Sequence, residues 1–152
     1  MISRFEQFTF IISKINREIQ KIERDEMVKK GYRGAFAIYL AALKRYDEGL
    51  TSVQLCELCD KDKAAVSRIL AEMEEKGLIE REKNNERGYR AKITLTEKGK
   101  EVAEFVNKRA ETAVKTVSGK VMTDEQREVF YQTMELLYKN LQKVSKEGIP
   151  QE

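Results

Sequence analysis

Apolar residues near both ends of the chain recur at the spacing of a helix that packs along a narrow seam. The separations alternate between three and four residues, first at Phe5, Phe8, Ile12, Ile15, Ile19 and Ile22, and again at Phe130, Met134, Leu137, Leu141 and Val144. A strict heptad seam is typical of helices that pack against another helix. We therefore expect the terminal helices to bind a second copy of the chain. Packing within one chain is the alternative.

Composition narrows the class of protein further. The 152 residues include one proline and are 36% charged, which favours long amphipathic helices over a sandwich or barrel. No run of 18 apolar residues is present, so we expect no membrane span. The first 15 residues lack the features of a signal peptide, and the expected location is the cytoplasm. With no histidine and no glycine-rich phosphate loop, we expect neither an enzyme nor a cofactor.

Capping residues and periodicity divide the chain into elements. Helices are expected at about residues 3–30, 35–46, 51–59 and 62–76, then from residue 96 to about 116 and from residue 123 onward. Thr51 with Gln54, and Thr123 with Gln126, have the spacing of capping boxes. Between them, residues 78–83 and 91–95 form a predicted hairpin around a polar turn. The order predicts a mainly α fold with a small β-hairpin wing (α+β): a winged helix-turn-helix core flanked by long dimerisation helices.

The expected helix at residues 62–76 has an outer face suited to the DNA major groove. Opposite its inward stripe of Val66, Ile69, Leu70 and Met73 lie Lys63, Ala64, Ser67, Arg68 and Ala71. Small residues allow close approach to base edges, and cationic side chains donate to bases and phosphates. Three glutamates follow only later, at Glu72, Glu74 and Glu75. This gradient favours a DNA-reading helix, although a cationic helix face is more often simply solvated.

Positive charge also gathers at the predicted hairpin. The net charge of the chain, +3, is too small to indicate a nucleic-acid partner by itself. Residues 81–92, however, contain five basic and two acidic residues. Nearby, the three basic residues Lys61, Lys63 and Arg68 are balanced by one acidic residue, Asp62. We therefore expect a basic surface formed by one helix tip and one hairpin.

Three motifs in this region resemble the MarR family of bacterial transcriptional regulators. They are D-K-A-A-V-S-R at residues 62–68, E-E-K-G-L-I-E-R at residues 74–81 and L-T-E-K-G at residues 95–99. The helical order on both sides is similar as well. The resemblance implies a homodimeric regulator, expected to repress, that binds a pseudo-palindromic site on double-stranded DNA. Half-sites would lie about one helical turn apart.

The resemblance also implies roles for individual residues. Ser67 and Arg68 match positions that contact bases or phosphates, and Lys61 and Lys63 match the helix tip. The candidate DNA-binding residues are Lys61, Lys63, Ala64, Ser67, Arg68, Lys83, Arg87 and Arg90. The candidate dimerisation residues are Phe5, Phe8, Ile12, Ile15, Ile19, Phe130, Met134, Leu137 and Leu141.

The domain organisation follows from the same resemblance. Residues 1–152 form one expected MarR-type domain, with dimerisation helices at 1–34 and 97–147 and the DNA-binding region at 35–96. Two departures stand out. The wing tip has no clear Asp-x-Arg pattern, so the arginine that enters the minor groove is not assigned. Asp60 occupies a turn position where the family usually has glycine, and we expect the turn to form because aspartate tolerates the left-handed conformation.

Two further features are candidate sites: a pair of cysteines and a group of aromatic residues. Cys56 and Cys59 form a C-x-x-C inside a helix, but no histidine or third cysteine completes a zinc site. Leu55, Leu58 and Cys59 are expected to face the core, and for the cysteines redox sensing is the less favoured alternative to core packing. The resemblance leaves room for a small-molecule effector between the dimer helices and the DNA-binding lobe. Its candidate contacts, which are more often core residues, are Tyr32, Phe36 and Tyr39.

The rival class of function is a helical interaction protein. In that interpretation the heptad seams bind another protein, and the winged helix binds no DNA. Salt-dependent binding to duplex DNA distinguishes the two.

Overall fold

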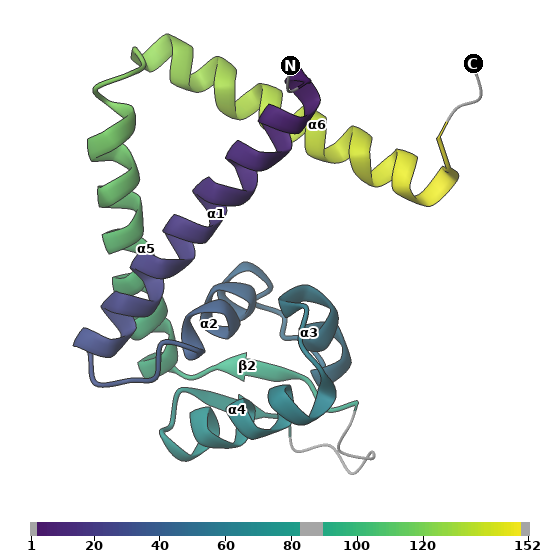
Figure 1. Ribbon diagram of the computed structural model, residues 1–152. Helices are drawn as coiled ribbons and strands as arrows, with labels where there is room; N and C mark the ends of the chain where they lie inside the picture. Colours follow the sequence, from purple (N-terminus) through teal and green to yellow (C-terminus); the bar gives the residue numbers. More distant parts are fainter. Residues whose placement is uncertain (1–2, 83–89, 150–152) are drawn as a thin grey trace. The chain divides into compact units, whose positions relative to one another are not determined.

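A computed structural model describes residues 3–82 and 90–149 (Figure 1). Six helices and a two-stranded sheet follow one another along these residues. The helices are α1 (Arg4–Lys29), α2 (Phe36–Arg45), α3 (Ser52–Cys59), α4 (Lys63–Glu75), α5 (Glu97–Ser118) and α6 (Asp124–Glu147). The strands β1 (Ile79–Arg81) and β2 (Ile93–Leu95) lie between α4 and α5. The mainly α fold with a hairpin is as predicted.

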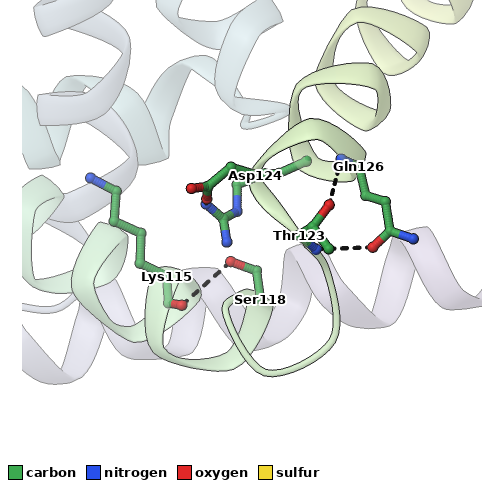
Figure 2. Close-up of polar contacts among 6 residues, drawn as sticks. Lys115, Ser118, Thr123, Asp124 and Gln126 are labelled. Carbon is green, nitrogen blue, oxygen red and sulfur yellow. Dashed lines mark hydrogen bonds and ion pairs between the residues drawn. The ribbon is translucent and has the colours of Figure 1, made fainter.

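Side-chain caps explain where several helices begin. Thr51 caps α3 and Thr123 caps α6, each in the reciprocal capping box that the sequence predicted. In Figure 2 the Thr123 hydroxyl accepts from the Gln126 backbone N–H, while the Gln126 side chain accepts from the Thr123 N–H. Ser3 forms a third box with Glu6 at the start of α1. These reciprocal bonds satisfy amide donors that a helix start would otherwise leave unpaired.

The chain forms two compact units, Met1–Glu111 and Thr112–Glu152. In the first, α2 is the central helix, as its apolar sequence predicted: five of its residues are buried, and it contacts α1, α3 and β2. The inward stripe of α4 is fully confirmed, since Val66, Ile69, Leu70 and Met73 are all buried. Val102, Ala103 and Val106 of α5 complete this core.

The hairpin is antiparallel and shorter than predicted. Ile79 pairs with Leu95, Glu80 with Thr94 and Arg81 with Ile93. Ile93 and Leu95 face the core, as the alternation predicted, and Leu50 adds an isolated bridge to Ile93. The sheet therefore closes one side of the core and extends from the end of α4.

The second unit is almost devoid of core. No residue of α6, a helix that lies wholly in the described part of the chain, is buried. Ser118, at the end of α5, is buried and its hydroxyl donates to the Lys115 carbonyl (Figure 2). The seam residues Phe130, Leu137 and Leu141 remain exposed. The apolar side of α6 therefore has no counterpart in this unit.

The prediction for one residue was wrong. Leu58 was expected to face the core with Leu55 and Cys59, yet 48% of its surface is exposed. Residues Leu55 and Cys59 lie four apart and nearly eclipse each other along the helix, which sets the buried direction. Leu58 projects about 100° away from Cys59, and on a helix as short as α3 the core covers only one narrow side.

Candidate nucleic-acid interface

The turn between α3 and α4 fixes where the candidate recognition helix begins. Asp60 adopts the left-handed conformation (φ 51°, ψ 52°), as expected for aspartate in place of glycine. The Lys61 N–H then donates to the Cys56 carbonyl at 3.1 Å and closes α3. Asp62 caps α4, its carboxylate accepting from the Ala65 N–H at 2.9 Å. That backbone hydrogen bond lowers the pKa of Asp62, so the cap stays ionised at neutral pH.

The outer face of α4 is open to solvent. Because the opposite stripe is buried, the orientation of the helix is set, and the predicted outer residues Lys63, Ala64, Ser67, Arg68 and Ala71 are all exposed. Lys61 is exposed at the tip. Lys61, Lys63 and Arg68 form no ion pair with another described residue. The structure thus brings five of the eight predicted DNA-binding residues onto one surface, which we call the α4 face: Lys61, Lys63, Ala64, Ser67 and Arg68.

The acidic half of α4 is engaged by cations from other elements. Arg33, in the turn before α2, pairs with Glu72 at 2.5 Å, and Arg81 on β1 pairs with Glu74 at 3.1 Å. Arg81 was counted among the basic residues of the hairpin, but neither ion pair was predicted from the sequence, and Arg33 lies 39 positions from its partner. Pairing reduces the repulsion that these carboxylates would exert on phosphates nearby.

The wing is only partly described. Lys83 and Arg87 lie outside the described residues, so their predicted positions stay predictions. Arg90 is exposed where the chain returns toward β2. Lys92 instead reaches back, and its ammonium donates to the Glu48 carbonyl at 3.1 Å. Of the basic residues beyond β1, Arg90 is therefore the described candidate for the DNA surface.

A cavity of about 640 Å³ lies beside the α4 face, lined by parts of α1, α2 and α4. Four cationic side chains line it, those of Arg24, Arg33, Lys61 and Arg68, together with the carboxylates of Glu23 and Glu72. Of the three aromatic residues predicted near an effector, only Tyr39 lines it; Phe36 is wholly buried in the core and Tyr32 packs against that core. Tyr39 is buried in the core as well, so the prediction that these residues are mainly core is supported for all three.

The cysteines are free, and Cys59 is buried in the core. Burial raises the pKa of the Cys59 thiol to about 11, so at neutral pH it is protonated and a poor nucleophile. This favours core packing over redox chemistry for Cys59. Within the described ranges, no group of His, Cys, Asp and Glu is arranged to hold a metal ion. No described helix is long and apolar enough to cross a membrane.

A capped helix, a tight turn, a second helix with an open polar face and a hairpin define a winged helix-turn-helix protein. A sequence model of the MarR family matches residues 37–88. The resemblance to the MarR family is thereby confirmed: the central region matches it in sequence, and the chain has the MarR fold.

Solved structures support the fold over nearly the whole chain. A crystal structure of MarR superposes with a TM-score of 0.77 at 23% identity, covering 97% of this chain and 99% of that one. A MarR family regulator from Listeria monocytogenes, complexed with a 26mer DNA, gives 0.70 at 20% identity, covering 95% and 97%. MarR from Staphylococcus aureus, in complex with salicylate and kanamycin, gives 0.71 at 21%, covering 91% and 92%. No curated protein matches the sequence.

Proposed function

We propose that this protein is a transcriptional regulator that binds double-stranded DNA sequence-specifically as a homodimer. The observation that carries the proposal is the α4 face, a solvent-exposed surface of small and cationic residues on the first two turns of a rigidly packed helix. An α-helix of this kind fits the major groove, where each base pair has its own pattern of donors and acceptors.

The residues of the α4 face have separable roles in this proposal. Arg68 donates to guanine edges or to phosphate, since a guanidinium can bind both acceptors of guanine at once. Lys61 and Lys63 neutralise phosphates at the helix tip. Ala64 and Ser67 keep the backbone close to the bases. The Arg33–Glu72 pair supports the role of Arg68. Glu72 stands four positions after Arg68 and could pair with it along the helix, but Glu72 pairs with Arg33 and leaves the Arg68 guanidinium available for DNA.

The wing supplies the second contact. Lys83, Arg87 and Arg90 bind the minor groove or the backbone in this proposal. Their contribution is mainly electrostatic and insensitive to sequence, since phosphate contacts position a protein and base contacts specify the site.

The dimer accounts for the exposed seams. Phe5, Phe8 and Ile15 of α1, and Phe130, Leu137 and Leu141 of α6, leave large apolar areas in contact with water. Such surfaces mark protein interfaces. We assign dimerisation to residues 1–34 and 97–147 and DNA reading to residues 35–96, within a single MarR-type domain. A two-fold dimer requires a pseudo-palindromic operator with half-sites about one helical turn apart.

Repression, and its relief by a small molecule, complete the proposal. The cavity beside α4 has the volume of a small-ligand site. Its four cationic side chains outnumber its two carboxylates, Glu23 and Glu72, so the lining favours an anion. Arg68 belongs both to this lining and to the α4 face, so a bound anion would compete with DNA for the same guanidinium. The S. aureus neighbour was crystallised with salicylate, which makes salicylate a suitable probe in a DNA-binding assay.

Selection of bound sequences from a random duplex pool tests the function directly. We expect one enriched motif with two inverted half-sites and a fixed spacing. An unenriched pool at low salt would favour the alternative, a helical protein-interaction module whose winged helix binds no DNA. We propose no enzymatic role, because the α4 face and its surroundings present groups for binding and no nucleophile paired with a base.

A further inference from the structure

The C-terminal end of α4 is bonded directly to the first turn of α5. The Thr96 hydroxyl donates to the Gly77 carbonyl at 2.6 Å, and the Thr96 N–H donates to the Leu78 carbonyl at 3.1 Å. The Lys98 ammonium donates to the carbonyl of Lys76, the C-cap of α4, at 2.8 Å. Three hydrogen bonds therefore join three successive carbonyls after α4 to two residues at the start of α5.

One hydroxyl serves both helix ends. While it donates to Gly77, the Thr96 oxygen also accepts from the Gly99 N–H at 3.0 Å, which caps α5. The last carbonyls of a helix have no partner within that helix, and those of α4 accept from the N–H groups of residues 76–78. The carbonyls of these three residues in turn accept from Thr96 and Lys98, and the Lys98 ammonium also lies at the negative end of the α4 dipole. The end of α4 and the start of α5 are thus tied by the same groups.

Gly99 brings the two backbones into contact. A Cβ placed on Gly99 would lie 1.9 Å from the Leu78 carbonyl oxygen, so no other residue fits without moving the helix. Gly99 is buried, and its backbone packs directly against the carbonyl of Leu78. We call Thr96, Lys98 and Gly99, with the carbonyls of residues 76–78, the α4–α5 joint.

We propose that Thr96, Lys98 and Gly99 are positioning residues for DNA recognition, which set where the α4 face stands relative to α5. The proposal rests on the proposed function, in which α5 belongs to the dimerisation region. If α4 is fixed on the start of α5, the orientation of each recognition helix relative to that helix is fixed as well. The joint then helps to determine which half-site spacing the dimer accepts, although none of its residues touches a base.

A spacing assay separates this role from ordinary stabilisation. The wild-type protein and its variants are titrated against the selected operator and against the same operator with one base pair inserted between the half-sites. The measured quantity is the ratio of the two affinities. A variant that is partly unfolded binds both duplexes less well by the same factor, so lost stability leaves the ratio unchanged.

Thr96→Val keeps the shape of the side chain and removes its hydroxyl, while Thr96→Ser keeps the hydroxyl and serves as the matched control. Lys98→Met, added to Thr96→Val, removes the remaining side-chain bond. We expect the wild-type protein and Thr96→Ser to discriminate strongly against the lengthened operator. In Thr96→Val/Lys98→Met the ratio should fall about three- to tenfold, the scale of one or two hydrogen bonds.

The outcomes distinguish a positioning role from a purely structural contact and from failure of the proposed function. An unchanged ratio in the double variant, with wild-type binding intact, overturns the positioning role and leaves the joint a purely structural contact. A wild-type protein indifferent to spacing overturns it too, because no spacing is then set. A wild-type protein that binds no duplex at all contradicts the proposed function itself.

Discussion

Helices α4 and α6 are both amphipathic, but they leave opposite faces to solvent. The apolar stripe of α4 is buried within the chain, and its exposed face is small, polar and cationic. The apolar seam of α6 is exposed at Phe130, Leu137 and Leu141 and half-buried at Met134 and Val144, so none of its residues is buried. The character of an exposed face indicates the partner it can bind: a hydrated polyanion for α4, and another apolar surface for α6.

The largest effect is expected in the buried stripe. Leu70 is wholly buried, so Leu70→Ala should cost about 2–5 kcal/mol of unfolding free energy through lost contacts and a cavity. Leu141→Ala makes the same chemical change on α6, where 61% of the leucine is exposed. Its cost should depend on protein concentration, since it acts through association. Urea unfolding at two protein concentrations measures the loss of unfolding free energy in both variants. Equal losses that do not depend on protein concentration would contradict the proposed difference between α4 and α6.

A charge on the α6 seam should act mainly on assembly. Leu137→Lys places an ammonium in the proposed dimer interface, where an unpaired buried charge costs several kcal/mol; we expect the dissociation constant to rise about a hundredfold. Leu136→Lys is the matched control, because the neighbouring leucine is exposed but lies off the seam. Sedimentation equilibrium provides the readout. If the two variants associate equally well, the seam is not the interface.

The wing should affect the dependence of binding on salt. Removing Arg87 and Arg90 together takes away two phosphate contacts, which should flatten the slope of log affinity against log salt by about two units. Between 50 and 200 mM salt this corresponds to roughly a sixteenfold difference in the loss of affinity. An unchanged slope would mean that the hairpin does not touch phosphate, and the cationic surface would then be limited to α4.

Helix α1 resembles α6 near its start, where its apolar residues are exposed, and resembles α4 near its end, where Glu26 and Met27 are buried. There the Glu26 carboxylate accepts from Lys29 at 2.5 Å and from Arg109 of α5 at 3.2 Å. The hydrogen bond from Lys29, aided by Arg109, lowers the pKa of Glu26. A lowered pKa in the folded state stabilises the protein above the ordinary carboxyl pKa of 4.5 and loses this contribution as the pH falls.

The smallest predicted effect follows from this carboxylate. Glu26→Gln should lower the unfolding free energy at pH 7, and the difference from wild type should shrink as the pH falls below 4.5. Glu97→Gln is the control, because the Glu97–Lys100 pair is exposed to solvent and should contribute little. A difference that is constant from pH 7 to pH 3 would show that the ion pairs of Glu26 do not stabilise α1 on α5.

Local signals predicted much of the fold. Thr51, Asp62 and Thr123 cap helices where the sequence placed them, because a cap depends only on a side chain and an amide three positions later. The stripe of α4 was predictable for the same reason, since helical spacing alone determines which residues share a face. The α4 face followed from that stripe.

Contacts between distant segments were not predictable. The Arg33–Glu72 pair and the α4–α5 joint bring together residues 18 to 39 positions apart, and no spacing rule links them. Leu58 was placed wrongly because α3 makes little more than two turns, and so few apolar residues do not determine which side the core covers. The motif at residues 95–99 marked the joint in the sequence without revealing what Thr96 and Gly99 contact.

The most direct test of DNA reading by α4 is the ratio of affinities for the selected operator and for a scrambled duplex of equal length. Arg68→Ala should reduce this ratio to near one while leaving the dimer intact, because in the proposed complex the guanidinium donates to base edges and Arg68 lies outside the proposed dimer interface. Lys146→Ala, which removes a charge from the last turn of α6, should preserve the ratio. An Arg68→Ala protein that retained the wild-type ratio would contradict the assignment of α4 as the recognition helix.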